Sequence, residues 1–191
     1  MTITEEKILN GIKHFVKNTK NVGRVKLFKL LYFWDFIHFE RYGKTITLYE
    51  YFTFPFGPVP QKRFDDIQDE KLPEYLDINI SIIEDYTEDE DDGFKRFKII
   101  LKNKKIDYDC FSPNEKQVLE DVTYIFREAT AKQMTEVTHL KNSPWHKTIN
   151  EHGMYKSIDY FLAIDENTPF DQEEITERFN LQKELFADGR I

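Results

Sequence analysis

One segment limits the possible folds of this chain more than any other, the helix predicted over Arg24–Tyr42. Twelve of its nineteen residues are apolar or aromatic, and they fall on nearly every face of the helix. A helix that is apolar all round is buried on most sides, because a surface helix needs only one apolar stripe. Gly43 follows directly and is a typical helix terminator. We therefore expect a central helix around which the remaining elements pack.

The remaining pattern predicts a mainly helical α+β domain. Thr2 and Glu5 form a capping box, so an amphipathic helix begins there and runs to about Asn18. Capping residues predict three more helix starts, at Ser112, Thr130 and Ser143. The first two of these helices, joined by a tight turn within residues 112–142, resemble a helix-turn-helix pair.

Segments rich in β-branched and aromatic residues predict short strands. The first covers residues 45–56 and runs into Phe-Gly-Pro-Val-Pro at 56–60, where we expect two prolines to end the strand and fix a rigid turn. A short helix is expected to follow, to about Glu70. Residues 78–83 and 94–101 are expected to form a hairpin.

Residues 154–191 are expected to extend a domain that covers residues 1–153. Within this extension, alternating apolar residues over 158–164 predict a strand, and residues 171–187 have the period of an amphipathic helix. An exposed amphipathic helix can lay its apolar face into a groove of another protein. We therefore expect this last helix to face a partner.

Acidic residues are concentrated in one run. The chain carries 27 Lys and Arg against 35 Asp and Glu, a net charge of −8. Seven of the carboxylates lie within residues 84–92, and without them the net charge is −1. Such a run repels itself and stays solvated, which predicts an exposed hairpin tip. This charge distribution argues against a basic nucleic-acid-binding arm and against an acidic nucleic-acid mimic. One local acidic projection favours a partner with a basic surface.

The sequence carries no mark of secretion or membrane insertion. Cys110 is the single cysteine, which excludes an internal disulfide and a cysteine-based zinc site. The first residues lack the basic and apolar regions of a secretion signal. The longest uncharged stretch, residues 51–61, has eleven residues, whereas about 20 apolar residues are needed to span a bilayer. We expect a cytoplasmic protein.

No local motif of catalysis is found. The chain lacks Gly-x-Ser-x-Gly, Gly-x-Gly-x-x-Gly, a Walker loop and His-Glu-x-x-His. Two carboxylate-x-x-His pairs, Asp35 with His38 and Glu136 with His139, each share a helix face, as in di-iron bundles. The four long helices and additional inward glutamates of such bundles are not predicted here. We predict no catalytic residue, no metal and no cofactor, and we keep a small carboxylate–histidine metalloenzyme as the last of three hypotheses.

The helix pair over 112–142 is the basis of a second hypothesis, a DNA-binding transcription regulator. Its four basic residues are outnumbered by five acidic ones. Because phosphate contacts supply most non-specific affinity for DNA, a net-acidic reading unit argues against this function.

Four blocks of sequence together resemble the Panacea domain of SocA-like antitoxins. They are Lys-Leu-Phe-Lys-Leu-Leu-Tyr-Phe at 26–33 with the following Gly43, Phe-Gly-Pro-Val-Pro at 56–60, Ser-Pro at 112–113, and Thr-His at 138–139 with Pro-Trp at 144–145. Their order and spacing match over about residues 24–153. The resemblance implies an antitoxin of a bacterial or prophage toxin–antitoxin system that binds a toxin encoded nearby and has no catalysis of its own. It also implies an AAA+ protease as a further partner, because at least one relative delivers its toxin to one.

Seven positions match the family motifs and are partner-binding candidates by this resemblance: Lys29, Tyr32, Gly57, Pro58, Val59, His139 and Trp145. Each also has a scaffold interpretation, as a buried aromatic, a fixed turn or a satisfied histidine. We favour the scaffold interpretation for most of them, because a domain that pairs with diverse toxins is expected to vary at its contact surface.

Overall fold

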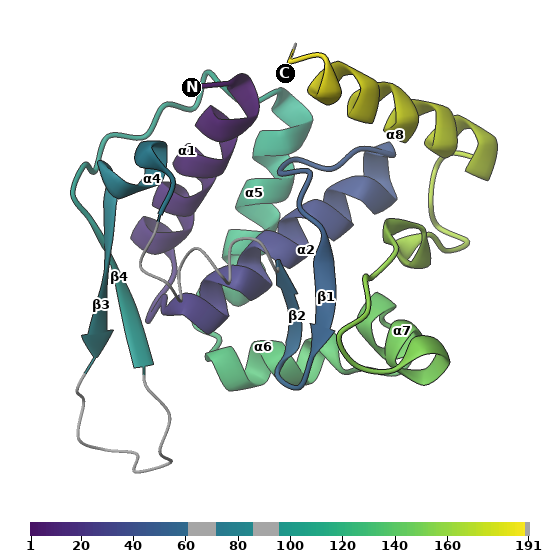
Figure 1. Cartoon of the computed structure of the whole chain (residues 1–191), viewed down its shortest axis with the longest axis horizontal. Helices are drawn as coiled ribbons and strands as arrows, with labels where there is room; N and C mark the ends of the chain where they lie inside the picture. The colour runs from purple at the N-terminus through teal and green to yellow at the C-terminus, as the bar shows by residue number, and fades with distance from the viewer. Residues whose placement is uncertain (61–71, 86–95, 190–191) are drawn as a thin grey trace.

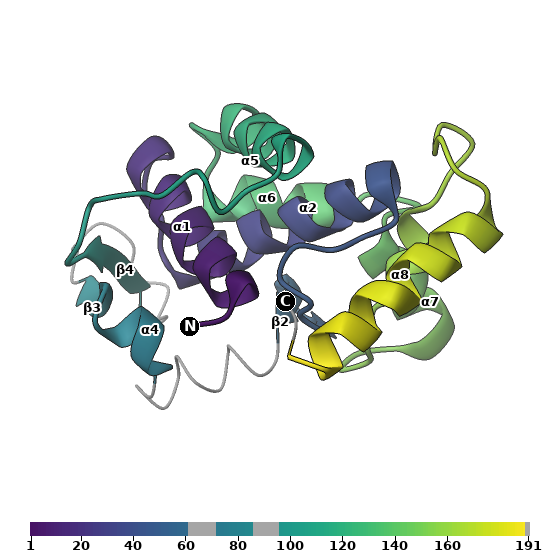
Figure 2. The same ribbon diagram turned by 90° about the horizontal axis from the view of Figure 1, so that it is seen from above.

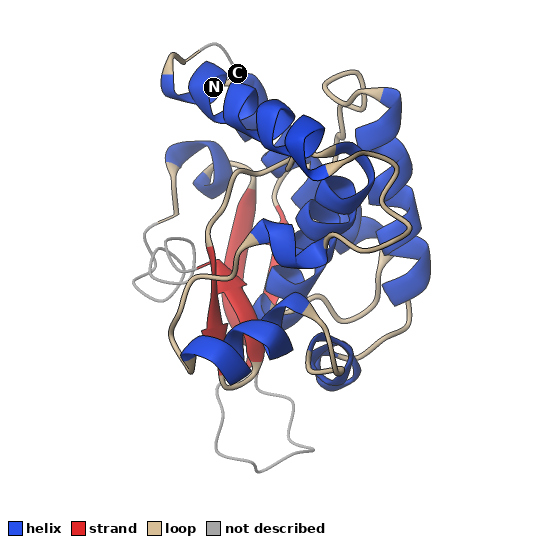
Figure 3. Cartoon of the chain, turned by 90° about the vertical axis from the view of Figure 1, so that its right-hand side faces the viewer, coloured by secondary structure: helices blue, strands red, loops and turns tan. Residues whose placement is uncertain are grey.

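The computed structural model describes residues 1–60, 72–85 and 96–189 and has a mainly helical α+β fold, as predicted (Figure 1). Seven α-helices and two antiparallel hairpins lie in these residues. In the described residues, all strands belong to these two hairpins, which Figure 3 shows in red between the blue helices. The helix predicted before Glu70 and the acidic run beyond Asp85 lie outside the described residues. No helix in the described part is long and apolar enough to cross a membrane.

Helix α2 (Arg24–Tyr42) is the central element, as its apolar sequence predicts (Figures 1 and 2). It ends at Gly43, which has a left-handed φ of 67° and donates its amide hydrogen to the carbonyl of Phe39. Opposite sides of α2 enter two apolar clusters. The first includes Leu27, Leu30, Leu31 and Trp34. The second includes Tyr32, Phe36 and Phe39.

The first cluster joins α2 to the N-terminal part of the fold. Helices α1 (Ile3–Asn18) and α5 (Pro113–Phe126) lie beside α2, and both begin with the predicted capping boxes (Figure 2). The short helix α4 (Glu74–Asp77) and the hairpin of β3 (Ile80–Asp85) with β4 (Arg96–Leu101) close the cluster. Trp34 packs edge-on against Phe15, with ring centroids 5.7 Å apart.

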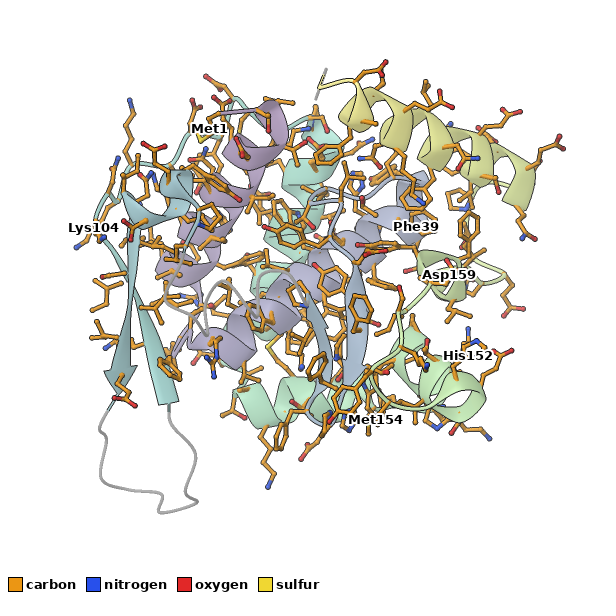
Figure 4. The ribbon with its side chains drawn as sticks, in the orientation of Figure 1. Met1, Phe39, Lys104, His152, Met154 and Asp159 are labelled. Carbon is orange, nitrogen blue, oxygen red and sulfur yellow. The ribbon has the colours of Figure 1, made fainter. Side chains whose placement is uncertain are left out.

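The second cluster joins α2 to the hairpin of β1 (Tyr51–Phe54) with β2 (Gly57–Pro60) and to the C-terminal part. Helices α6 (Ala131–Thr138) and α7 (Pro144–His152) follow α5, and the 3₁₀ helix η1 (Tyr160–Ala163) leads to α8 (Gln172–Ala187). Figure 4 shows Phe39 near α8, His152 beside α7, and Met154 between α7 and the first hairpin.

The prediction that two prolines end the first strand is wrong. Gly57–Pro60 forms β2 and pairs antiparallel with β1, with Phe52 opposite Val59. Both strands of a two-stranded hairpin are edge strands, so a proline nitrogen can face away from the partner strand. The predicted strand over 45–56 is also too long, because only Tyr51–Phe54 pairs with β2.

The strand predicted over 158–164 is also wrong. Residues Tyr160–Ala163 form η1, which begins where the Asp159 carboxylate accepts a hydrogen bond of 3.0 Å from the amide of Phe161. The segment before η1 lies alongside β1, where Phe52 and Ser157 form an isolated bridge and the amide of Ile158 donates a hydrogen bond of 2.8 Å to the carbonyl of Tyr51, but it forms no strand of its own. The alternation of apolar residues arises because Ile158 and Tyr160 both point into the second cluster.

Apolar residues of α8 pack against the rest of the fold. Ile175 and Phe179 are buried in the second cluster, and the Phe179 ring lies 5.0 Å from that of Phe39. The Gln182 side chain accepts a hydrogen bond of 3.0 Å from the amide of Thr45 and donates one of 2.6 Å to its carbonyl. The first half of the face that we expected to dock on a partner is therefore covered by α2 and η1, whereas Leu181 and Phe186 in the second half are exposed.

We expect Phe179→Ala to lower the free energy of unfolding by about 3–5 kcal/mol, because it opens a cavity in the second cluster. Phe186→Ala on the same helix is the matched control. Its side chain is 46% exposed, so a loss below about 1 kcal/mol is expected. Urea unfolding of the two variants measures both values, and equal losses would show that α8 is not anchored through Phe179.

Candidate functional site

The seven motif residues come together from three segments, although they are spread over more than a hundred positions of sequence. Lys29 of α2 donates a hydrogen bond of 3.2 Å from its Nζ to the carbonyl of Pro58 in β2. Gly57 lies against the same lysine and against α6. A Cβ atom at Gly57 would stand 2.6 Å from Thr138 Oγ1 and 2.8 Å from Lys29 Nζ. A residue without a side chain is therefore required for the hairpin to approach α2 and α6 this closely.

Lys29 is a buried cation with few partners. Its side chain is 1% exposed, and burial lowers the pKa of its ammonium group to about 7. Among the described residues, the Pro58 carbonyl is the only group that accepts a hydrogen bond from Lys29 Nζ. Lys26, one turn earlier, is equally buried but donates to two carbonyls, of Lys20 at 2.7 Å and of Ala129 at 2.6 Å. The two lysines therefore tie α2 to the loops around it.

His139 and Trp145 form the third part of the cluster. Their rings are stacked, with centroids 3.8 Å apart and an interplanar angle of 18°. The Trp145 indole donates a hydrogen bond of 3.2 Å to the carbonyl of Phe54 in β1. Burial, together with the nearby charge of Lys29, lowers the pKa of His139. Burial also raises the pKa of Tyr32, and the neighbouring backbone amide of Trp145 opposes that shift.

These contacts make the cluster a clamp that holds the first hairpin against α2, α6 and α7. Lys29, Tyr32, Val59 and Trp145 are all less than a tenth exposed. Their burial supports the scaffold interpretation and leaves little of these side chains for a partner to touch. Direct contact of these residues with a partner stays a prediction.

A groove lies next to this clamp. It has a volume of about 530 Å³ and runs between the second half of α2, the α6–α7 junction and η1. Its apolar part is formed by Phe33, Phe36 and Ile37 of α2, and its charged part by Glu40, Lys147 and Asp165. Burial and the charge of Asp165 both raise the pKa of Glu40, while Arg41 opposes them. Sequence analysis missed this groove, because its charged residues come from three separate elements.

The first carboxylate–histidine pair considered for a metal centre, Asp35 with His38, is hydrogen-bonded within the protein. The Asp35 carboxylate is fully buried and accepts hydrogen bonds from the amides of Ile46 and Thr47, both at 2.8 Å, and from the hydroxyls of Thr47 and Tyr51. His38 Nδ1 lies 2.6 Å from the carbonyl of Lys44. Within the described ranges, no three His, Cys, Asp or Glu side chains gather closely enough to hold a metal ion.

The helix pair proposed for DNA reading forms, but α5 and α6 are both packed into the fold. Val118, Leu119 and Val122 of α5 are fully buried in the first cluster. Helix α6 is held to the first hairpin, where the Thr135 hydroxyl donates a hydrogen bond of 3.2 Å to the carbonyl of Phe56. The net charge of −1 over 112–142 therefore belongs to a unit whose apolar side faces the core.

The buried Lys29 should make stability depend on pH. Its pKa of about 7 in the folded protein lies below the ordinary value of 10.5, so between these values the unfolded chain binds the extra proton. Stability therefore rises with pH in this window. Relative to Lys29→Met, wild-type protein should gain roughly 1 kcal/mol per pH unit between about pH 7 and 10.

Urea unfolding across this pH range measures the gain. Lys132→Met makes the same chemical change on the exposed side of α6 and is the matched control. A constant difference between wild type and Lys29→Met would show that Lys29 does not titrate with folding.

We expect Gly57→Ala to lower the free energy of unfolding by about 2–5 kcal/mol, from a strained backbone and from overpacking against Thr138. Gly153→Ala is the matched control. Gly153 also has a positive φ, 84° against 95° at Gly57, but nothing lies within 4 Å of its added Cβ. Its expected loss is about 1–2 kcal/mol. Thermal or urea unfolding measures both, and similar losses would contradict the close approach at Gly57.

Comparison with known proteins agrees with this arrangement. The family model for the Panacea domain of SocA-like antitoxins matches residues 27–146, which contain most of α2, both hairpins, α4, α5, α6 and the start of α7. The matched range includes all seven motif positions. Searches of curated proteins and of solved structures gave no match. Because the match covers more than half of the chain, this protein belongs to the SocA-like antitoxin family and carries a Panacea domain.

Proposed function

We propose that this chain is an antitoxin that neutralises a toxin encoded beside it by binding the toxin directly, without catalysis of its own. The observation that carries the proposal is the family match over residues 27–146. The chemistry of the chain is consistent with a binding role. The buried ionisable groups Lys26, Lys29 and Asp35 are engaged in holding loops and strands to α2. We place this pairing in the bacterial cytoplasm, where both proteins would be made.

The proposal is tested by expressing the adjacent gene from an inducible promoter, with and without this chain. We expect growth arrest when the neighbour is expressed alone and restored growth on co-expression. A version of this gene with an early stop codon is the control, because it keeps the transcript and removes the protein. A neighbour that is harmless, or toxicity that persists on co-expression, would overturn the proposal.

Delivery of the toxin to an AAA+ protease is the further part of the proposal, and it rests on the family resemblance. Direct blocking leaves the toxin intact and bound, whereas delivery removes it. The amount of toxin in co-expressing cells, with and without the candidate protease, therefore separates the two modes. Unchanged toxin levels in both strains would leave direct binding as the mode of neutralisation.

A further inference from the structure

The groove between α2, the α6–α7 junction and η1 has the size and lining to hold a segment of another protein. Its volume of about 530 Å³ lies within the range of about 300–1,000 Å³ that is usual for ligand pockets. Phe33, Phe36 and Ile37 give it an apolar lining that comes from one face of α2. This face is rigid, because α2 is packed on both sides by the two clusters.

The apolar lining continues out of the groove onto the surface. Val137, at the end of α6, is 38% exposed and lines the groove, and Leu140, in the turn that follows, is 61% exposed. An apolar strip that leaves a groove in this way suits a polypeptide segment better than a compact small molecule, because only a chain can cover both parts. Buried apolar area of this kind is the usual source of affinity in peptide-binding grooves.

The charge at one end of the groove defines the chemistry of that segment. Glu40 and Asp165 both line this end, and neither forms an ion pair with any of the described residues. Arg41, next to Glu40, is held instead by Asp121, with 2.6 Å between its guanidinium nitrogen and the carboxylate oxygen. The Lys147 ammonium group donates a hydrogen bond of 2.8 Å to the carbonyl of Leu162. The Asp165 carboxylate accepts hydrogen bonds from the amide (2.8 Å) and the side chain (3.5 Å) of Asn167, so neither it nor Glu40 is neutralised by a cation at ion-pair distance among the described residues.

We propose that this groove binds a segment of the toxin that places apolar side chains on the half-buried Phe33 and Ile37 and an Arg or Lys between Glu40 and Asp165. The inference rests on the proposed antitoxin function and names the surface that performs it. Arginine fits such a pair well, because its planar guanidinium can donate to two carboxylates at once. The bound cation would also relieve the repulsion between Glu40 and Asp165.

Charge reversal at the groove tests the proposal. The dissociation constant of the purified adjacent-gene product is measured by calorimetry with wild-type protein and with Glu40→Lys/Asp165→Lys. We expect the reversal to weaken binding about tenfold or more, because it places like charges against the basic residue. Glu136→Lys, on the exposed side of α6 and outside the groove, is the matched control and should change affinity less than about twofold.

A second variant and a second readout keep the test independent of folding defects. Glu40→Gln/Asp165→Asn removes the two charges with little change of shape and should also weaken binding if the melting temperature is unchanged. Hydrogen exchange in the complex should show new protection over residues 137–147 and 160–165. A toxin that binds wild type but is indifferent to both groove variants, without protection there, would overturn the groove while leaving the antitoxin function intact. A neighbour that is toxic but does not bind wild type would overturn the proposed function itself.

Discussion

The buried carboxylate of Asp35 is the interaction on which much of the remaining structure depends. A carboxylate without solvent is stable only if hydrogen bonds replace its hydration, and here two amides and two hydroxyls from residues 46–51 do so. Burial raises the pKa of Asp35, and these four donors oppose that shift. The segment that supplies them is thereby fixed against α2, and it leads directly into β1. Asp35 thus helps to place the start of the first hairpin, and through the Trp145–Phe54 hydrogen bond this hairpin is linked to α7.

The same principle explains why the family motif lies inside the molecule. The most deeply buried charged side chains of α2 have no access to water, and they hydrogen-bond to other elements instead. Lys26 and Lys29 use carbonyls of loops and of β2, and His38 uses the carbonyl of Lys44. Motif residues such as Lys29 and Gly57 therefore define how the elements are assembled. Recognition of a partner is left to side chains nearer the surface, and we propose those around the groove.

The sequence predicts the parts of this fold that are determined locally. The capping boxes at Thr2, Ser112 and Thr130 and the left-handed Gly43 depend on residues within one turn of helix, and all are confirmed. The wrong predictions concern segments whose secondary structure depends on contacts with residues distant in the sequence. The strand status of Gly57–Pro60 depends on β1 and on Lys29, and the 3₁₀ helix at Tyr160–Ala163 depends on the second cluster. The groove depends on Glu40 and Asp165, which no periodicity brings together. Lys26 and Lys29, among the apolar residues of the first half of α2, are a local sign that this helix binds carbonyls of other segments.

The residues that hold this fold together are separate from the charged residues that line the groove. The groove residues Glu40, Lys147 and Asp165 lie on elements whose stability comes from their other faces, namely the two apolar clusters and the Asp35 network. Substitution of surface side chains usually alters folding stability by less than about 0.5 kcal/mol. Charge at the groove can therefore be exchanged without disturbing the frame that Lys29, Gly57 and Trp145 hold together. A frame of this kind can keep one fold while its groove is adapted to toxins of different chemistry, as the family resemblance implies.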